Sequence, residues 1–307
     1  MGREFKKFFH SSESLKAQKS LNLVRTVVFV GLLFLFSKGI LAQQILPVHL
    51  EDVNFMSQGA RFSGTLYSPQ VSYTAVVLVH GSGQESQLKE FATLLAASGI
   101  AVLTYDKRGV GASEGVYAGP EVGTNNIDST NLHLLAQDAR AAVNLLKQKL
   151  PSLPLGLLGF SQAGWIIPLA ATANPLVEFM VLFSGPTVTT LEQLRFQFYT
   201  AGRTDFWEHH SETDAREHIQ NDPDRFQFAP TDPKASLTAL TIPGLWLFGG
   251  KDIQIPTNLC IEKLQALKAQ GKPFDYALFP ELGHRTGFAG SAPVAFAIEW
   301  IKTKSQE

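Results

Sequence analysis

The residue types that can activate a serine hydroxyl occur in this sequence at positions that each follow a predicted strand. Ser161 lies between an apolar run over 155–159 and a helical pattern over 163–171. A serine in such a tight strand-to-helix turn exposes its hydroxyl, and the first backbone N–H groups of the helix point toward the same place. The spacing therefore predicts a nucleophilic serine at position 161.

A serine hydroxyl attacks efficiently only when a base takes its proton and a third group orients that base. Asp252 follows the predicted strand over 245–248, and His284 follows the predicted strand over 274–278. In a parallel sheet, such loops gather at the carboxyl edge, where ligands bind. We expect Ser161 to attack, His284 to carry the proton and Asp252 to orient the histidine.

Other acids and histidines compete less well for these roles. Asp106 also ends a predicted strand, but its neighbours Lys107 and Arg108 favour a structural charge network. The loop after the predicted strand over 178–183 offers no acid. His80 precedes the nucleophile in the chain and adjoins a glycine-rich turn, so we expect it to shape that turn.

Acyl chemistry on Ser161 also needs two N–H donors for the negative charge that develops on the substrate oxygen. The backbone N–H of Gln162, at the start of the helix, is one expected donor. The other is expected from the turn over 80–83, at Ser82 or, as the alternative, at Gly83. Because these donors belong to the backbone, replacing the Ser82 side chain is expected to have a mild effect.

Strand and helix patterns alternate along most of the chain. Two alternating runs over 48–56 and 61–67 flank Gln58-Gly59 and predict an edge hairpin. Continuous apolar runs over 74–79 and 100–105 predict buried parallel strands. Helical patterns occur over 87–97, 132–150, 256–269 and 292–301. This alternation predicts an α/β domain, with right-handed crossovers and helices on both faces of a mainly parallel sheet.

The segment 186–240 interrupts this alternation, because it has no buried-strand pattern and is rich in aromatic residues. These are Phe196, Phe198, Tyr199, Phe206, Trp207, Phe226 and Phe228. We expect a helical lid whose aromatic residues either form an acyl pocket or anchor the lid to the core. His210, Asp214 and His218 are spaced so that they would line one helical face and could bind a metal, but the mixed charges over 208–217 favour a solvated face.

The composition limits the classes of function. The chain has 307 residues, of which 45% are hydrophobic and 17% charged, and its formal net charge is −1. These values fit one large α/β domain and do not suggest nucleic-acid binding. Cys260 is the single cysteine, which excludes an intramolecular disulfide, and its apolar helical surroundings predict burial.

Residues 1–42 form a separate pattern. Basic side chains precede an apolar run over 27–36, and small residues follow up to Ala42. This order predicts a secretory signal cleaved near Ala42 and an exported domain over 43–307, either periplasmic or secreted. An uncleaved N-terminal membrane anchor is the alternative, although the apolar run is shorter than the roughly 20 residues that a spanning helix needs.

Five motifs occur together in this chain. They are His80-Gly81-Ser82-Gly83, Asp106-Lys107-Arg108-Gly109-Val110-Gly111, Gly159-Phe160-Ser161-Gln162-Ala163-Gly164, Gly249-Gly250-Lys251-Asp252 and Gly283-His284. In this order they resemble the α/β-hydrolase superfamily, and most closely exported bacterial esterases of the EstD type and serine-aminopeptidase-like hydrolases. The resemblance covers roughly 51–301. It implies an α/β-hydrolase fold, with a mainly parallel eight-stranded sheet and a helical lid over about 186–240.

One residue departs from the pattern of these relatives. Ala163 stands two positions after the serine, where glycine is common because helix and strand pack closely. An extra methyl group in a tight site costs roughly 1 to 3 kcal/mol unless the backbone opens. We expect the turn to tolerate Ala163, with Gly164 relieving the crowding.

The resemblance and the motifs predict an exported carboxylesterase that acts on small to medium acyl esters through an acyl-enzyme, without a metal or organic cofactor. The expected partner is a small acyl substrate, with membrane contact only through an uncleaved N-terminal segment. A peptidase, thioesterase or acyltransferase on the same residues is the alternative, and a non-catalytic binding protein is a third. An aminopeptidase needs an acid to grip the substrate amine, for which Glu192, Glu208 and Glu212 are candidates.

Overall fold

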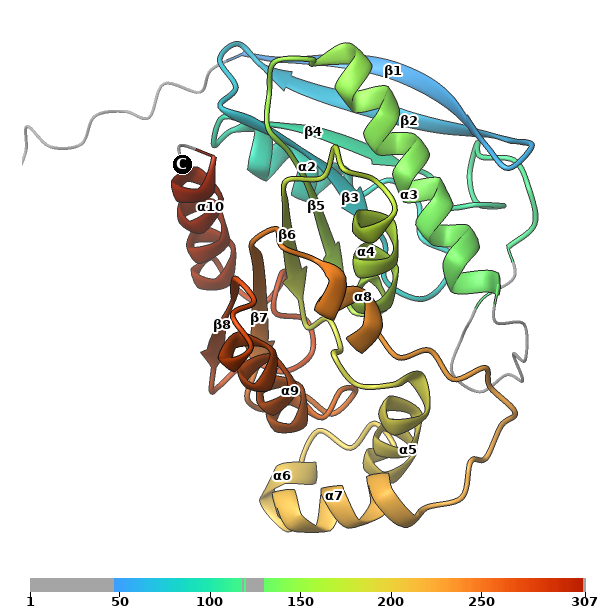
Figure 1. The fold of residues 1–307 in the computed structure, drawn as a ribbon, viewed down its shortest axis with the longest axis vertical. Coiled ribbons are helices and arrows are strands. Elements are labelled where there is room, and N and C mark those ends of the chain that lie inside the picture. Colours follow the sequence, from blue (N-terminus) through green and yellow to red (C-terminus); the bar gives the residue numbers. More distant parts are fainter. Residues whose placement is uncertain (1–46, 118, 120–129, 306–307) are drawn as a thin grey trace, which may run out of the picture. The chain divides into compact units, whose positions relative to one another are not determined.

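The central element of the fold is an eight-stranded sheet with the strand order β1-β2-β4-β3-β5-β6-β7-β8 (Figure 1). The computed structural model describes residues 47–117, 119 and 130–305. The strands are β1 (Val48–Ser57), β2 (Ala60–Pro69), β3 (Thr74–Val79), β4 (Ile100–Tyr105), β5 (Leu155–Phe160), β6 (Phe179–Phe183), β7 (Gly244–Gly249) and β8 (Phe274–Phe279). The sheet is antiparallel at β1-β2 and β2-β4 and parallel from β4 to β8, which confirms the predicted mainly parallel sheet.

The hairpin at the edge of the sheet forms where the sequence predicts it. β1 pairs with β2 in register from Val48↔Pro69 to Ser57↔Ala60. The two turn residues, Gln58 and Gly59, both have positive φ, of 47° and 75°. This backbone is that of a two-residue turn whose twist matches the strands, and glycine adopts it without strain.

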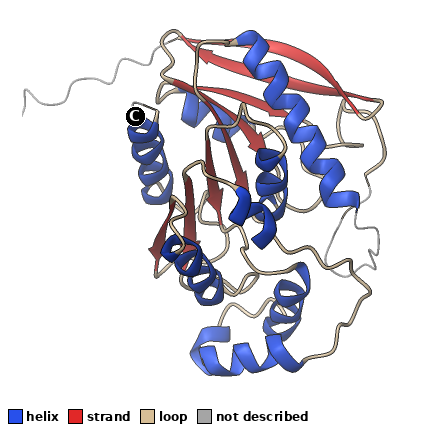
Figure 2. Ribbon diagram, viewed as in Figure 1, coloured by secondary structure: helices blue, strands red, loops and turns tan. Residues whose placement is uncertain are grey.

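Helices cover both faces of the sheet, as Figure 2 shows. They are α2 (Lys89–Ala96), α3 (Thr130–Lys149), α4 (Ala163–Thr172), α5 (Thr190–Thr200), α6 (Phe206–His209), α7 (Glu212–Asn221), α8 (Lys234–Ala239), α9 (Thr257–Ala269) and α10 (Ala292–Lys304). Successive strand residues alternate between two cores: Val77 belongs to the core that includes residues of α3, α4 and α9, whereas Val76 and Leu78 belong to the core that includes residues of α2 and α10. Burial on both faces explains why these strands are continuous apolar runs.

Four helices lie between β6 and β7, in the segment where the sequence predicts a helical insertion. Of these, α5, α6 and α7 lie beyond the carboxyl ends of the central strands (Figure 1). They share a small core of their own, made by Phe196, Phe206, Ala215 and Ile219. α8 instead contributes Leu237 to the main core. We call α5, α6 and α7 the lid helices.

Cys260 is fully buried in α9, as predicted, and burial raises the pKa of its thiol to about 12. The predicted signal or anchor over 1–42 lies outside the described residues. Within the described ranges, no helix is long and apolar enough to cross a membrane.

Candidate active site

Ser161 occupies a strained turn between β5 and α4. Its φ is 48°, in the left-handed region that a residue with a side chain rarely adopts. The Ser161 N–H donates to the carbonyl of Phe183 at 3.0 Å, and the Gly164 N–H donates to the Ser161 carbonyl at 2.8 Å. These bonds hold the serine at the apex, between the end of the strand and the first turn of the helix.

Close packing at this turn depends on Gly159 rather than on Gly164. A Cβ atom placed on Gly159 would lie 2.4 Å from the Ala163 Cβ. The Ala163 methyl therefore fills the space that the bare glycine leaves. A Cβ on Gly164 would instead lie 2.5 Å from the Pro186 nitrogen. The absence of a side chain at Gly164 therefore allows the backbone after β6 to pack against α4. The expectation that Gly164 makes room for Ala163 is wrong.

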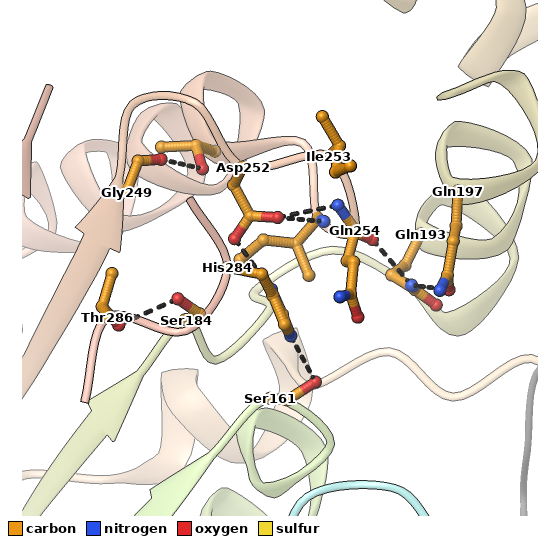
Figure 3. A network of polar contacts seen from close by, with 12 residues as sticks. Ser161, Ser184, Gln193, Gln197, Gly249, Asp252, Ile253, Gln254, His284 and Thr286 are labelled. Carbon is orange, nitrogen blue, oxygen red and sulfur yellow. Dashed lines mark hydrogen bonds and ion pairs between the residues drawn. The ribbon is translucent and has the colours of Figure 1, made fainter. Parts of the chain in front are cut away.

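The structure brings Ser161, His284 and Asp252 into one hydrogen-bonded line (Figure 3). His284 Nε2 lies 2.9 Å from Ser161 Oγ, and His284 Nδ1 lies 2.8 Å from Asp252 Oδ2. An ionised carboxylate only accepts hydrogen bonds. Nδ1 therefore carries the proton and donates it to Asp252, which leaves Nε2 as the acceptor for the serine hydroxyl. The Asp252 side chain is 0% exposed and that of His284 11%.

The second carboxylate oxygen of Asp252 is bound by the backbone of its own loop. Oδ1 accepts the N–H of Gln254 at 2.7 Å and that of Ile255 at 3.0 Å. Two hydrogen bonds from backbone N–H donors fix the plane of this carboxylate. Asp252 therefore presents Oδ2 to His284 in one orientation.

The lid helices hold this loop from the other side. The Trp207 indole N–H donates to the Asp252 carbonyl at 2.8 Å. The Thr200 hydroxyl donates to the Ile253 carbonyl at 2.6 Å, and the Gln193 amide donates to the Gln254 carbonyl at 2.8 Å. Three successive carbonyls, from 252 to 254, thus bind side chains of α5 and α6. The lid is fastened to the loop that carries the acid.

The loop that carries His284 is anchored beneath the site by Thr286, which is fully buried. The Thr286 hydroxyl lies 3.0 Å from the Ser184 hydroxyl, after β6, and donates to the Leu247 carbonyl of β7 at 3.3 Å. Figure 3 shows Thr286 and Ser184 together on the strand side of the histidine. These contacts with the ends of β6 and β7 therefore fix the position of the loop that carries His284.

The expected oxyanion donors, Ser82 and Gln162, both line the pocket beside Ser161. The loop and helix that carry them meet at Lys107, whose side chain is 2% exposed. Its Nζ donates to the carbonyls of Gly81 at 2.7 Å and Gly83 at 3.1 Å, and to Gln162 Oε1 at 3.1 Å. One buried ammonium group thus ties the turn after β3 to the residue that follows Ser161.

Replacing Lys107 with methionine is expected to lower kcat for ester hydrolysis by about tenfold to hundredfold with little change in KM, which is less than the roughly 10² to 10³ that the complete loss of an oxyanion donor costs. The donors remain in the variant, but their turn is no longer fixed and the positive charge behind it is gone. Steady-state kinetics measures both constants. Lys89→Met, at an exposed lysine of α2, is the matched control. A raised KM with unchanged kcat would contradict this role.

The other charged residues of the motif over 106–111 point in different directions. The Asp106 carboxylate accepts the N–H of Gln87 at 3.1 Å and that of Ala112 at 3.0 Å. Arg108 pairs with the buried Asp138 of α3. The motif is structural, as expected, but it joins three separate parts of the fold instead of forming one local charge network.

His80 is buried away from the reacting atoms. Burial lowers the pKa of its imidazole to about 3, and the nearby charge of Lys107 acts in the same direction. The ring packs edge-on against Tyr105, with centroids 4.9 Å apart. A neutral imidazole with so low a pKa is a poor general base, so its place fits the expected role in shaping the turn.

Two pockets meet at Ser161. Ser82, Ser161 and Gln254 line both of them. The smaller, which we call the lid pocket, has a volume of about 40 Å³ and is further lined by Gln162, Trp165, Thr190, Gln193, Leu194 and Phe228. The larger, which we call the aromatic pocket, has a volume of about 360 Å³ and is further lined by Leu88, Phe160, Phe183, Phe288, His284 and Arg285, with Glu85.

Among the aromatic residues of the segment 186–240, Phe228 fits the pocket role and Trp207 the anchor role, but most of the others take neither of the two expected roles. Phe196 and Phe206 are buried in the core of the lid helices, and Trp207 stacks on Phe196. Phe198 pairs with Phe226. Phe228 lines the lid pocket. Most of them therefore build the lid itself.

The three lid residues considered as metal ligands have other partners. Tyr199 hydrogen-bonds His210 at 2.9 Å, and His218 lies 2.9 Å from Asp222. Asp214 caps α7 through Ser211. Among the described residues, no three His, Cys, Asp or Glu side chains form a group that could hold a metal ion.

Sequence reasoning missed several residues that support this site. The sequence presents Lys107 only as a neighbour of Asp106, and the anchors Gln193 and Thr200 carry no local signal, whereas Trp207 is among the aromatic residues expected to anchor the lid. A lysine directly after a buried strand was the one available clue, since a buried lysine needs acceptors nearby. Phe288, on the histidine loop, was also overlooked.

Comparison with known proteins adds independent information. A family model described as serine aminopeptidase, S33, matches residues 72–233. Human monoglyceride lipase is 28% identical over 137 residues, which are 42% of this chain and 42% of the lipase. Esterase EstD of Thermotoga maritima is 25% identical over 251 residues, which are 72% of this chain and 58% of the esterase. The chain thus spans about half the length of these curated relatives.

Solved structures with the same fold are more distant in sequence. An esterase of Pyrococcus furiosus superposes with a TM-score of 0.61 at 18% identity, over 84% of this chain and 92% of that one. An acylaminoacyl peptidase of Pyrococcus horikoshii reaches 0.58 at 15% identity, over 86% of this chain and 43% of that one. At such identities the likeness establishes the fold alone. Because the S33 model matches more than half of its length, this chain belongs to the S33 serine aminopeptidase family of α/β hydrolases.

Proposed function

We propose that this protein is an exported carboxylesterase that hydrolyses small to medium acyl esters through an acyl-enzyme on Ser161. The observation that carries the proposal is the hydrogen-bonded line from Ser161 through His284 to Asp252, at the junction of two pockets. The names of its curated relatives, an esterase and a monoglyceride lipase, support the same reaction class.

The reaction follows from this geometry. The Ser161 oxygen attacks the ester carbonyl carbon while His284 Nε2 takes the hydroxyl proton, and Asp252 stabilises the imidazolium that forms. The backbone N–H groups of Gln162 and Ser82 receive the negative charge on the carbonyl oxygen. His284 then gives its proton to the departing alcohol oxygen. Water, activated by the same histidine, cleaves the acyl-enzyme and releases the acid.

Aminopeptidase activity is less well supported, because the acids expected to grip a substrate amine are either paired elsewhere or exposed to solvent. Glu192 pairs with Lys263 at 2.9 Å, Glu212 pairs with Arg216 at 3.0 Å, and Glu208 is exposed. None of them lines either pocket among the described residues.

Glu85 is the remaining acid to consider, since it lines the aromatic pocket. It accepts the Gly81 N–H at 2.9 Å. Burial raises the pKa of its carboxyl, against the opposing effects of Lys107 and Arg285. A carboxyl group with these cationic neighbours offers little net attraction to an ammonium group.

Matched substrates separate the activities. We expect p-nitrophenyl acetate and butyrate to give higher kcat/KM than an aminoacyl p-nitroanilide or an acyl thioester. All three reactions are followed by absorbance with the same preparation. Faster cleavage of the aminoacyl anilide would contradict the carboxylesterase assignment and favour a peptidase.

The export part of the proposal rests on the sequence pattern over 1–42, a basic flank followed by a short apolar run and small residues. Fractionation of bacterial cells that express the full chain tests it. Export predicts a shortened chain that begins near position 43 in the periplasm or medium. Full-length protein confined to the cytoplasm would contradict it.

A further inference from the structure

The two pockets beside Ser161 differ in which proposed catalytic residue lines them: His284 in one and Gln162 in the other. His284 lines the aromatic pocket, together with the next residues of its loop, Arg285, Gly287 and Phe288. Gln162, whose N–H is a proposed oxyanion donor, lines the lid pocket. The two sides of the nucleophile are therefore chemically distinct.

This difference assigns the two halves of an ester to the two pockets, if the proposed function holds. The bond that breaks joins the carbonyl carbon to the alcohol oxygen, and that oxygen receives its proton from His284 Nε2. The alcohol must therefore lie on the side of His284, which is the aromatic pocket. The acyl chain projects to the opposite side, into the lid pocket.

The walls of the aromatic pocket suit a ring. Phe160 stacks on Phe183 with centroids 5.4 Å apart and an interplanar angle of 19°. Phe288 lies 4.9 Å from Phe160, tilted by 32°. Gly287 lets the loop come this close, because a Cβ on it would lie 2.6 Å from the Phe160 ring. Aromatic rings pair favourably in stacked and tilted arrangements at these distances.

Part of the Phe288 ring is exposed to solvent. Phe288 is 48% exposed, although the pocket that it borders also has Leu88, Phe160 and Phe183 in its walls. The Arg285 guanidinium lies 5.5 Å from the ring centroid, on the same loop. A ligand ring in the pocket would remove apolar surface of Phe288 from water, which is a favourable change.

The volumes of the two pockets also favour a ring in the aromatic pocket and a short acyl chain in the lid pocket. A cavity of about 150 Å³ holds one benzene molecule. The aromatic pocket, at about 360 Å³, therefore has room for a substituted ring. The lid pocket, at about 40 Å³, admits only a short acyl chain.

We propose that the aromatic pocket binds the alcohol part of the substrate and that the preferred substrates are esters of short carboxylic acids with aromatic or arylalkyl alcohols. Phe288 is then a specificity-determining residue. The proposal rests on the carboxylesterase function and adds to it a substrate class.

The test compares benzyl acetate, ethyl acetate and benzyl octanoate. We expect the unaltered protein to favour benzyl acetate over ethyl acetate by about tenfold or more in kcat/KM, the effect of burying part of one ring. Benzyl octanoate should be the poorer benzyl ester. Phe288→Ala should bring the benzyl-to-ethyl ratio close to one.

Phe296→Ala is the matched control, because Phe296 is 46% exposed on α10 and lines neither pocket. It should leave the ratio unchanged. A ratio near one in the unaltered protein, a preference for octanoate, or a ratio that survives Phe288→Ala would each overturn the proposal. In those cases continued hydrolysis of ethyl acetate would leave the carboxylesterase function standing. Failure to hydrolyse any ester would overturn both.

Discussion

Replacing Ser161 with alanine is expected to lower kcat for p-nitrophenyl acetate by about 10⁶-fold, the loss seen when a serine nucleophile is removed. The alanine has no oxygen at the position 2.9 Å from His284 Nε2, so no acyl-enzyme can form. The small remaining rate would come from binding and from the oxyanion donors. Steady-state kinetics with freshly purified variant measures the effect.

Ser291→Ala is the matched control for this substitution. Ser291 is exposed before α10, and its side chain makes no capping hydrogen bond. Its replacement is expected to leave kcat and KM unchanged. If Ser161→Ala and Ser291→Ala were equally active, Ser161 would not be the nucleophile.

Replacing Asp252 with asparagine is expected to lower kcat by about 10⁴-fold, although the side chain keeps its shape. The N–H groups of Gln254 and Ile255 require an acceptor where Oδ1 now lies. The amide oxygen of the variant takes that place, so its NH₂ group faces His284 Nδ1. The imidazole must then accept at Nδ1 and carry its proton on Nε2, where it cannot take the serine proton.

Steady-state kinetics of the Asp252→Asn variant checks this prediction through KM and kcat. Because the backbone donors fix the amide, KM should change little while kcat falls. Asp232→Asn, at an exposed acid before α8, is the control and should retain full activity. A large rise in KM with kcat preserved would show that Asp252 acts in binding instead.

The local signals in the sequence are enough to predict a mainly parallel α/β sheet and the residues that meet in the site. Strand-end loops carry Ser161, Asp252 and His284, and parallel strands must bring such loops to one edge. The hairpin over 48–69 was equally accessible, because Gln58-Gly59 favours a single type of turn.

The supports of the site could not be predicted in this way, because they depend on contacts between distant segments. Gln193 binds the carbonyl of Gln254, 61 positions later, and Lys107 binds Gln162, 55 positions later. Neither pair has a recognisable spacing. The packing at Ala163 was misjudged for the same reason, since the strand residue Gly159 makes the room.

The attachment of the lid to the acid loop has a consequence for catalysis. Side chains of α5 and α6 bind the carbonyls of residues 252 to 254, and the carboxylate of Asp252 binds the amides of 254 and 255. The lid helices therefore hold the carbonyl groups of this loop, and the Asp252 carboxylate holds its N–H groups. Such support keeps a catalytic side chain close to its productive position.

The measurement that tests the central claim most directly is labelling of the purified protein with a fluorophosphonate, followed by peptide mapping. A serine oxygen activated by His284 attacks the phosphorus and displaces fluoride. We predict one adduct, on the peptide that contains Ser161, with labelling strongly slowed in the Asp252→Asn variant. Labelling at another serine, or none in protein that is folded, would contradict the assignment of Ser161, His284 and Asp252 as the catalytic residues.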